Sequence, residues 1–213
     1  MVKYPAGSAR HRAINKPAGP SIEPPKAGTM QNLKASKKPT QYGSRGMSLE
    51  DRINQSNQYY LSHNLAVIHK KPTPIQVVKV DFPRRSAARI TEAYYRQAST
   101  TDYNGLYLGR YLDFEAKETT NKTSFPLANL PDHQIEHMRQ CYQQGGIVFL
   151  LISFKVHDKV YLLPFPALDQ WLESQKRKSL PLTYLESHGY LCQQGVFPMI
   201  DYLAAVDLWL QAH

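Results

Sequence analysis

The stretch YLDFEAKET, residues 111–119, alternates between polar or charged and apolar side chains. Asp113, Glu115 and Lys117 occupy every second position, with apolar residues between them. Successive side chains on a β-strand point to opposite faces, so this period of two places the charges on one face. The pattern therefore predicts a strand with one apolar and one charged face. The charged face is either a solvated sheet surface or a site that handles metal and phosphate.

The residues just before this stretch extend it into a predicted hairpin. Asn-Gly is a strong signal for a tight turn between strands, so we predict a turn at Asn104–Gly105. Asp102 lies near the start of the first strand, and Thr100 lies two residues earlier on the same face. Pairing of the strands brings Asp102 toward Glu115, since opposed residues lie about 4.5–5.5 Å apart.

Two carboxylates at this separation repel each other unless a cation lies between them. Oxygen ligands of this type suit Mg²⁺, which keeps several water molecules for the substrate side. Lys117 directs a positive charge to the same place, where it stabilises a pentacovalent phosphate or orients the attacking water. Asp102, Glu115 and Lys117 are therefore the predicted catalytic residues of a metal-assisted phosphodiester hydrolysis.

The other patterns predict an α/β protein with a mixed central β-sheet flanked by helices. IVFLLISF at 147–154 is apolar without alternation, which is typical of a strand covered on both faces. Ser48 and Asp51 form a predicted capping pair for a helix over 48–63. Further helices are predicted at 130–144, 166–176 and 198–211, with a loop between the last two, and further strands at 65–70, 75–80 and 160–165.

The block at about 71–98 is predicted to be a basic excursion between core strands. Its strand at 75–80 ends before Pro83, and a short helix is predicted from Ser86 to Arg96. Basic residues outnumber acidic ones here: Lys79, Arg84, Arg85, Arg89 and Arg96 stand against Asp81 and Glu92. This imbalance favours contact with phosphates over a merely solvated face.

The N-terminal residues carry most of the net charge of +9. Residues 1–47 hold nine Lys and Arg residues against a single acid, Glu23. They are rich in Pro, Gly and Ser and poor in large apolar side chains, so they cannot bury enough surface to offset chain entropy. We predict a disordered basic arm over 1–44, of a kind that binds polyanions, and one ordered domain over 45–213.

The cysteines and the apolar segments bear on the compartment. Cys141 and Cys192 have no partner at metal-ligand spacing, which fits a reducing cytoplasm and argues against a zinc site. The N-terminus has no apolar run like that of a signal peptide, and no segment approaches the roughly 18 apolar residues of a membrane helix. We expect a cytoplasmic, nucleoid-associated protein with no membrane partner.

The order of elements resembles the PD-(D/E)xK nuclease superfamily, in which an acid, a (D/E)xK strand and the following helix form a metal site. STTDYNGLYLGRYLDFEAKET at 99–119, with HQIEHM at 133–138, more closely resembles RecU-type Holliday junction resolvases. This likeness runs from about Arg45 to the C-terminus and implies a restriction-endonuclease-like core. The proline in the name PD-(D/E)xK precedes the acid, and Thr101 occupies this position before Asp102. The superfamily tolerates other residues there.

The resemblance also implies roles for single residues. Metal ligands are expected at Thr100, Asp102, Glu115 and Gln134, and Lys117 matches the lysine that assists the transition state. The basic excursion is expected to be a projecting stalk that enters the centre of a four-way junction. The predicted DNA-binding residues are Arg45, Lys79, Arg84, Arg85 and Arg89.

The implied function is a homodimeric endonuclease that depends on Mg²⁺, with Mn²⁺ as a substitute, and resolves Holliday junctions by paired symmetric nicks in recombination and DNA repair. Expected partners are four-way and other branched DNA, a RecA-type recombinase and a branch-migration helicase. Two alternatives stay open. One is a DNA-binding accessory protein that anneals strands and modulates a RecA-type recombinase; the other is a restriction-type or repair nuclease that cuts linear duplex.

Several polar residues near the predicted site allow two interpretations. Asp113 shares the face of Glu115, but an acid at a strand end is usually solvated. Glu50 in the first turn of a helix is favoured by the helix dipole alone, although the superfamily often has an acid there, which makes it a candidate accessory acid. His133 and His137 have a metal-ligand spacing, but without a third ligand we interpret them as exposed helix residues.

Overall fold

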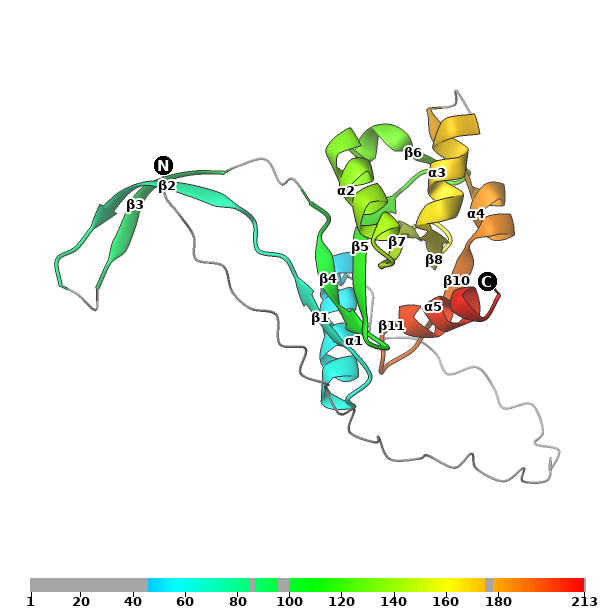
Figure 1. The fold of residues 1–213 in the computed structure, drawn as a ribbon, viewed down its shortest axis with the longest axis horizontal. Helices are drawn as coiled ribbons and strands as arrows, with labels where there is room; N and C mark the ends of the chain where they lie inside the picture. Colours follow the sequence, from blue (N-terminus) through cyan, green and yellow to red (C-terminus); the bar gives the residue numbers. More distant parts are fainter. Residues whose placement is uncertain (1–45, 85–86, 96–99, 175–177, 213) are drawn as a thin grey trace, which may run out of the picture. The chain divides into compact units, whose positions relative to one another are not determined.

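A seven-stranded sheet with the order β1-β4-β5-β7-β8-β10-β11 forms the centre of the protein. The structure is a computed structural model that describes residues 46–84, 87–95, 100–174 and 178–212 (Figure 1). The strands are β1 (Val67–Lys70), β4 (Tyr103–Tyr107), β5 (Arg110–Thr119), β7 (Ile147–Phe154), β8 (Lys159–Pro164), β10 (Tyr190–Gln194) and β11 (Ile200–Asp201). β5 and β7 are parallel and the other pairs are antiparallel, so the predicted mixed sheet is confirmed.

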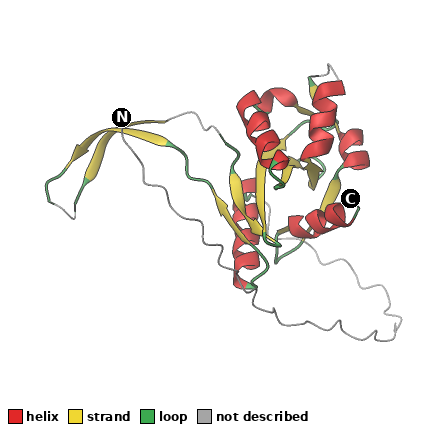
Figure 2. Cartoon of the chain, viewed as in Figure 1, coloured by secondary structure: helices red, strands yellow, loops and turns green. Residues whose placement is uncertain are grey.

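Helices cover both faces of this sheet (Figure 2). The side chains of Ile147, Phe149 and Leu151 on β7 pack in one core with α1 (Leu49–Ser62) and α5 (Tyr202–Gln211). The alternate side chains, Val148, Leu150 and Ile152, pack in a second core with α2 (Asp132–Gln143), α3 (Phe165–Ser174) and α4 (Leu182–His188). Every residue of β7 is buried, as its unbroken apolar run predicted.

The N-terminal helix begins as its sequence predicted. The Ser48 side chain accepts a hydrogen bond from the Asp51 backbone, and the Asp51 side chain accepts one from the Ser48 backbone, which completes a capping box. Among the described helices, none combines the length and the apolarity needed to cross a membrane.

The predicted turn at Asn104–Gly105 is wrong, because both residues lie within β4. The hairpin turns instead at Leu108 and Gly109, whose φ angles of 51° and 72° fit a two-residue turn of the primed type. Gly105 pairs with Ile68 of β1 and with Leu112 of β5. A Cβ at Gly105 would lie 2.0 Å from the Val67 carbonyl oxygen, so this glycine permits a close approach of β1.

The predicted helix at 86–96 is also wrong, because Arg89–Tyr95 forms strand β3. β3 pairs with β2 (Ile75–Asp81) in a separate two-stranded antiparallel sheet, here called the β2–β3 hairpin. Its β-branched and aromatic residues favour strands, and pairing with β2 outweighs the weak helical spacing. Apart from half-buried Val80, every residue of the two strands is exposed, so the rest of the described chain covers neither face.

The division into an arm over 1–44 and a domain over 45–213 stays a prediction, and the arm lies outside the described residues. The loop predicted between the last two helices is corrected by the structure. It contains β9 (Ser179–Pro181), α4 and β10, and the helix predicted at 198–211 begins only at Tyr202, after β11. β9 pairs with β6 (Ser124–Pro126), which precedes the short 3₁₀ turn η1 (Leu127–Asn129). These short elements depend on long-range pairing, which local sequence does not reveal.

Replacement of Gly105 by alanine tests the close approach of β1. The new Cβ would meet backbone atoms that cannot rotate away, so Gly105→Ala should lower the free energy of unfolding by about 3 kcal/mol or more. Gly109→Ala is the matched control, because no atom lies within 4 Å of a Cβ there and the positive φ alone should cost about 1 kcal/mol. Urea unfolding measures both; equal losses would contradict the steric role of Gly105.

Candidate functional site

β5 presents Asp113, Glu115 and Lys117 on one face, as the alternation predicted. The face is not a solvated surface, because the Asp113 and Glu115 side chains are fully buried and that of Lys117 is 24% exposed. α2 packs over this side of the sheet and contributes to the burial. The two carboxylates therefore need partners within the protein.

The structure brings Asp102 next to Glu115. Tyr103 of β4 pairs with Phe114 of β5, so Asp102 stands opposite Glu115 one position beyond the ladder. The Asp102 backbone N–H donates a hydrogen bond to Glu115 Oε2 at 2.9 Å. Lys117 Nζ lies 2.6 Å from Glu115 Oε1. One carboxylate thus has an amide on one oxygen and an ammonium group on the other.

The electrostatic balance at Glu115 favours its protonated form. Burial raises the pKa of this carboxyl from 4.5 to about 7, and the negative charge of Asp102 contributes in the same direction. The nearby Lys117 ammonium opposes the shift but does not cancel it. A carboxylate pair with such a balance is a site where an added cation lowers the energy.

Gln134 adds an uncharged oxygen to this region. α2 connects the parallel strands β5 and β7 and runs antiparallel to them, and His137 on α2 contacts Asp113 on β5 at 3.3 Å. From His137 back to Gln134 is about one helical turn, or about 5 Å along α2. From Asp113 forward to Glu115 is two strand residues, or about 6.6 Å along β5, which is a similar distance. We therefore expect Gln134 to lie near the level of Glu115. Its Oε1 is buried without a hydrogen-bond partner in the described part of the chain.

This donor set fits a hard divalent cation. A buried amide oxygen without a partner costs free energy, and a carboxylate with a raised pKa carries a charge that is incompletely balanced. A cation that prefers oxygen ligands would satisfy both groups. The sequence-predicted ligand Thr100 is half-buried and lies two residues before Asp102.

Glu50 lies close to Asp102 on the side of the sheet covered by α1. Both residues line a cavity of about 220 Å³, together with Tyr103 and Glu118. Glu50 also forms an ion pair with Lys70 at the end of β1. The accessory role of Glu50 stays a prediction, and its position beside Asp102 is compatible with that role.

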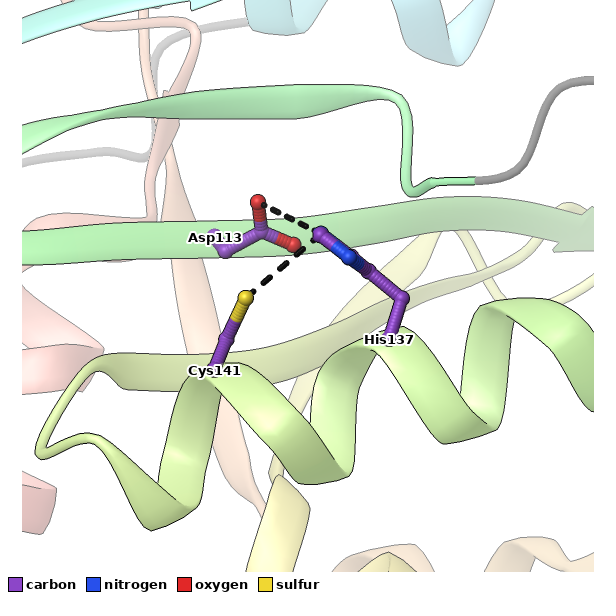
Figure 3. Close-up of side chains that lie close together, drawn as sticks. All are labelled: Asp113, His137 and Cys141. Atoms are coloured by element: carbon purple, nitrogen blue, oxygen red, sulfur yellow. Dashed lines mark hydrogen bonds and ion pairs between the residues drawn. The ribbon is translucent and has the colours of Figure 1, made fainter. Parts of the chain in front are cut away.

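A second group of polar side chains surrounds Asp113, and sequence reasoning missed it. Lys71 Nζ donates to Asp113 Oδ2 at 2.7 Å, and Tyr111 Oη donates to the same oxygen at 2.8 Å. Figure 3 shows His137 and Cys141 of α2 pointing toward Asp113. The expectation of a solvated Asp113 is therefore wrong.

The interpretation of the two helix histidines as exposed residues is also wrong. His133 is half-buried, and His137 turns its ring toward Asp113. The spacing of His137 and Cys141, one turn apart on a helix that follows the charged strand, was the signal in the sequence. The prediction that Cys141 has no partner at metal-ligand spacing is therefore also wrong. No pattern in the sequence pointed to Lys71, which depends on the pairing of β1 with β4.

The predicted DNA-binding residues are divided between described and undescribed parts of the chain. Lys79 and Arg89 lie on the β2–β3 hairpin, Arg84 lies in its connecting segment, and all three are exposed. Arg45 and Arg85 lie outside the described residues. The hairpin also exposes Phe82, Tyr94 and Tyr95, with relative exposures of 68%, 59% and 84%.

Fold and site together define a mixed α/β protein whose central strand holds buried carboxylates beside a lysine. The carboxylates are suited to bind a cation, and the lysine is suited to contact an anion. The family model described as Recombination protein U matches residues 44–208. The chain belongs to this family.

Relatives with high identity support the assignment. A protein of Pediococcus pentosaceus is 55% identical, with 91% of this chain and 96% of the relative covered. Proteins of Ligilactobacillus salivarius and Leuconostoc citreum are 57% and 51% identical, with 79% and 99% of this chain and 80% and 98% of the relatives covered. Each is named Holliday junction resolvase RecU.

A solved structure is also similar, at a level that carries no argument. It is described as the 1.6 Å structure of Archaeoglobus fulgidus Hjc, a Holliday junction resolvase from an archaeal hyperthermophile. The TM-score is 0.38 at 9% identity, with 64% of this chain and 92% of that chain covered.

Replacement of Glu115 by glutamine tests the electrostatic balance of the site in metal-free protein. Because the folded-state pKa is raised to about 7, ionised Glu115 opposes folding increasingly as pH rises from 4.5 to about 7. The difference in the free energy of unfolding, Glu115→Gln minus the unsubstituted protein, should therefore be about 2 kcal/mol larger at pH 8 than at pH 5, which means that the variant is relatively more stable at pH 8.

Urea unfolding in EDTA at the two pH values measures this difference. Asp169→Asn is a matched control, because Asp169 lies on α3 in a partly exposed ion pair with Arg139, away from the site. A Glu115→Gln difference that does not change with pH would contradict the raised pKa. Added Mg²⁺ at pH 8 should stabilise the unsubstituted protein more than the variant.

Proposed function

We propose that this chain is an endonuclease that resolves Holliday junctions by metal-dependent hydrolysis of phosphodiester bonds. The observation that carries the proposal is the contact of Asp102 with Glu115 beside Lys117 on a buried strand. The names of relatives that are at least 50% identical over most of the chain support the substrate.

The metal ligands in this proposal are Asp102, Glu115, Gln134 and Thr100, with Glu50 as the accessory acid. Gln134 Oε1 is buried and has no hydrogen-bond partner among the residues that the structure describes, and this atom and the raised pKa of Glu115 support a cation at this point. Mg²⁺, or Mn²⁺ in its place, would polarise the scissile phosphate and lower the pKa of a water molecule when bound. The set contains oxygen donors alone, which favours these ions over zinc.

Lys117 contributes a charge that the ligands lack. The Lys117 side chain is 24% exposed while that of Glu115 beside it is fully buried, so Lys117 lies at the border between the site and solvent. From this position it can contact a phosphate that approaches from outside. We assign it the stabilisation of the additional negative charge on the phosphate in the transition state.

The β2–β3 hairpin is the DNA-binding stalk in this proposal. Lys79, Arg84 and Arg89 are exposed on it and would contact phosphates of the DNA. Contacts of this kind recognise the shape of DNA and not its sequence. Exposed Tyr94 and Tyr95 offer faces on which unpaired bases can stack at a junction centre. The arm at 1–44, with Arg45, would add further phosphate contacts.

Two cuts resolve one junction, so the proposal includes a homodimer whose two-fold axis matches that of a four-way junction. A RecA-type recombinase and a branch-migration helicase are the proposed protein partners in recombination and repair. The proposed location is the cytoplasm, in association with the nucleoid.

The exposed hairpin also supports a second candidate, a DNA-binding accessory protein that anneals strands and modulates a recombinase. Asp102→Asn separates the two functions. The variant keeps the size of the side chain but removes the carboxylate beside Glu115, so Mg²⁺-dependent nicking of a synthetic four-way junction should fall at least about 100-fold. Junction binding in EDTA should stay nearly unchanged.

Gel electrophoresis of labelled junction strands measures the nicking, and Asp169→Asn provides the same chemical change at a distance. Undiminished nicking by Asp102→Asn would refute the assignment of the site. Junction binding without nicking by the unsubstituted protein would favour the accessory function. Linear duplex that displaces a junction at equal concentration would favour a restriction-type or repair nuclease.

The charges of the hairpin predict a change in the salt dependence of binding. The double substitution Lys79→Gln and Arg89→Gln removes two proposed phosphate contacts in each subunit, so the slope of log affinity against log salt should decrease in magnitude by about 1.8 per subunit, or about 3.6 for the proposed homodimer. The control substitutions Lys159→Gln and Lys178→Gln remove two exposed charges of the main domain. Fluorescence anisotropy with a labelled junction measures both slopes, and equal changes would refute a special role of the hairpin.

A further inference from the structure

Lys71 and Thr101 lie at the two ends of the segment 71–101 that contains the β2–β3 hairpin, and these positions are called here the ends of the hairpin. Lys71 directly follows β1, at the point where the chain leaves the seven-stranded sheet, and Thr101 precedes β4, where the chain returns to it. Lys71 Nζ donates a hydrogen bond to Thr101 Oγ1 at 2.8 Å. The ends of the hairpin are therefore tied to each other.

Asp113 ties both ends to β5. Its Oδ2 accepts from Lys71 Nζ at 2.7 Å, and its Oδ1 accepts a short hydrogen bond from Thr101 Oγ1. We call Lys71, Thr101 and Asp113 the hairpin clamp. The Lys71 backbone N–H adds a bond to the Asp102 carbonyl oxygen at 2.7 Å.

The clamp is shielded from water, so its bonds are not readily exchanged for bonds to solvent. Asp113 is fully buried, Thr101 is 2% exposed and the Lys71 side chain is 17% exposed. Tyr111 and His137 complete the surroundings of the Asp113 carboxylate. A buried charge that loses one partner is left uncompensated, which fixes this arrangement.

Asp113, His137 and Cys141 have the side chains of a metal site, but the position of Lys71 argues against a metal ion between them. Ligand atoms of Asp113, His137 and Cys141 lie within 4.8 Å of one another (Figure 3). Lys71 Nζ, however, lies 2.7 Å from Asp113 Oδ2 and 3.4 Å from His137 Nε2. A metal ion would have to share this space with an ammonium group of the same sign, so the group is organised around Lys71.

The clamp is adjacent to the proposed catalytic site along both strands. Asp113 precedes Glu115 by two residues on the same face of β5, and Thr101 precedes Asp102 directly. The Asp102 backbone in turn donates to Glu115. Any displacement of Thr101 from Asp113 would therefore move Asp102 relative to Glu115.

We propose that Asp113 is a positioning residue for the cleavage reaction: through Lys71 and Thr101 it ties the ends of the DNA-binding hairpin to β5 and thereby sets the separation of Asp102 and Glu115. This inference rests on the proposed function of the site. Asp113 itself does not bind the metal ion or the phosphate.

Thr101 offers a sharp test, because Thr101→Val removes the hydroxyl with little change of shape, and Thr101→Ser restores it. Thr101→Val should lower the single-turnover cleavage rate at saturating protein at least about 10-fold and weaken Mg²⁺ binding, measured by calorimetry, by a similar factor. Its junction affinity in EDTA should stay within about 3-fold, since the hairpin charges are intact. Thr101→Ser should recover most of the rate and the Mg²⁺ affinity.

Thr183→Val, at an exposed position of α4, is the matched control and should leave the rate and the Mg²⁺ affinity unchanged. Urea unfolding gives the folded fraction of each variant, so that rates refer to folded protein. A role in stability alone would lower the free energy of unfolding but leave the rate of folded protein at saturation unchanged. That result, or a Thr101→Ser variant as slow as Thr101→Val, would overturn the proposal.

The unsubstituted protein in the same assay separates this inference from the proposed function. If it binds Mg²⁺ but leaves the junction uncut, the proposed function fails, and the Mg²⁺ affinities still decide whether the clamp sets the separation of Asp102 and Glu115. Equal Mg²⁺ affinities of the unsubstituted protein and Thr101→Val would then overturn the clamp as well.

Discussion

The burial of two carboxylates on one face of β5 constrains the rest of the structure. Asp113 and Glu115 are both fully buried, and a buried charge is tolerated only with close polar partners. Those partners come from segments distant in the sequence, because Lys71 follows β1 and Asp102 precedes β4. The order β1-β4-β5 in the sheet is therefore what makes this face of β5 possible.

The two carboxylates differ in how completely the protein balances their charges. Asp113 has the Lys71 ammonium, the hydroxyls of Thr101 and Tyr111 and the His137 ring within contact distance. Glu115 has Lys117 but also the negative charge of Asp102, and its pKa is raised to about 7. The balanced carboxylate suits a structural role, whereas the unbalanced one retains the capacity to bind a cation.

Local patterns in the sequence predicted those features whose causes are local. The alternation around Glu115, the capping box of Ser48 and the apolar run at 147–154 each depend on neighbouring residues, and each prediction of an element was right. The sequence placed Gly105 in a turn. The position requires glycine because Val67 approaches closely, and Val67 lies on another strand, so local sequence does not reveal this requirement. The burial of Asp113 depends on Lys71, 42 residues away, and no local pattern contains that contact.

The β2–β3 hairpin is exposed, but its ends are fixed by bonds to the buried face of β5. An isolated two-stranded ribbon is marginally stable in water, and this one exposes both faces, including Phe82 and Tyr95. Covering such side chains with DNA would release free energy that folding of the chain leaves unused. The binding would act on the site only if the ends of the ribbon were fixed. The bonds of Lys71 and Thr101 to Asp113 fix them, because these bonds are buried and charged while the ribbon itself is exposed.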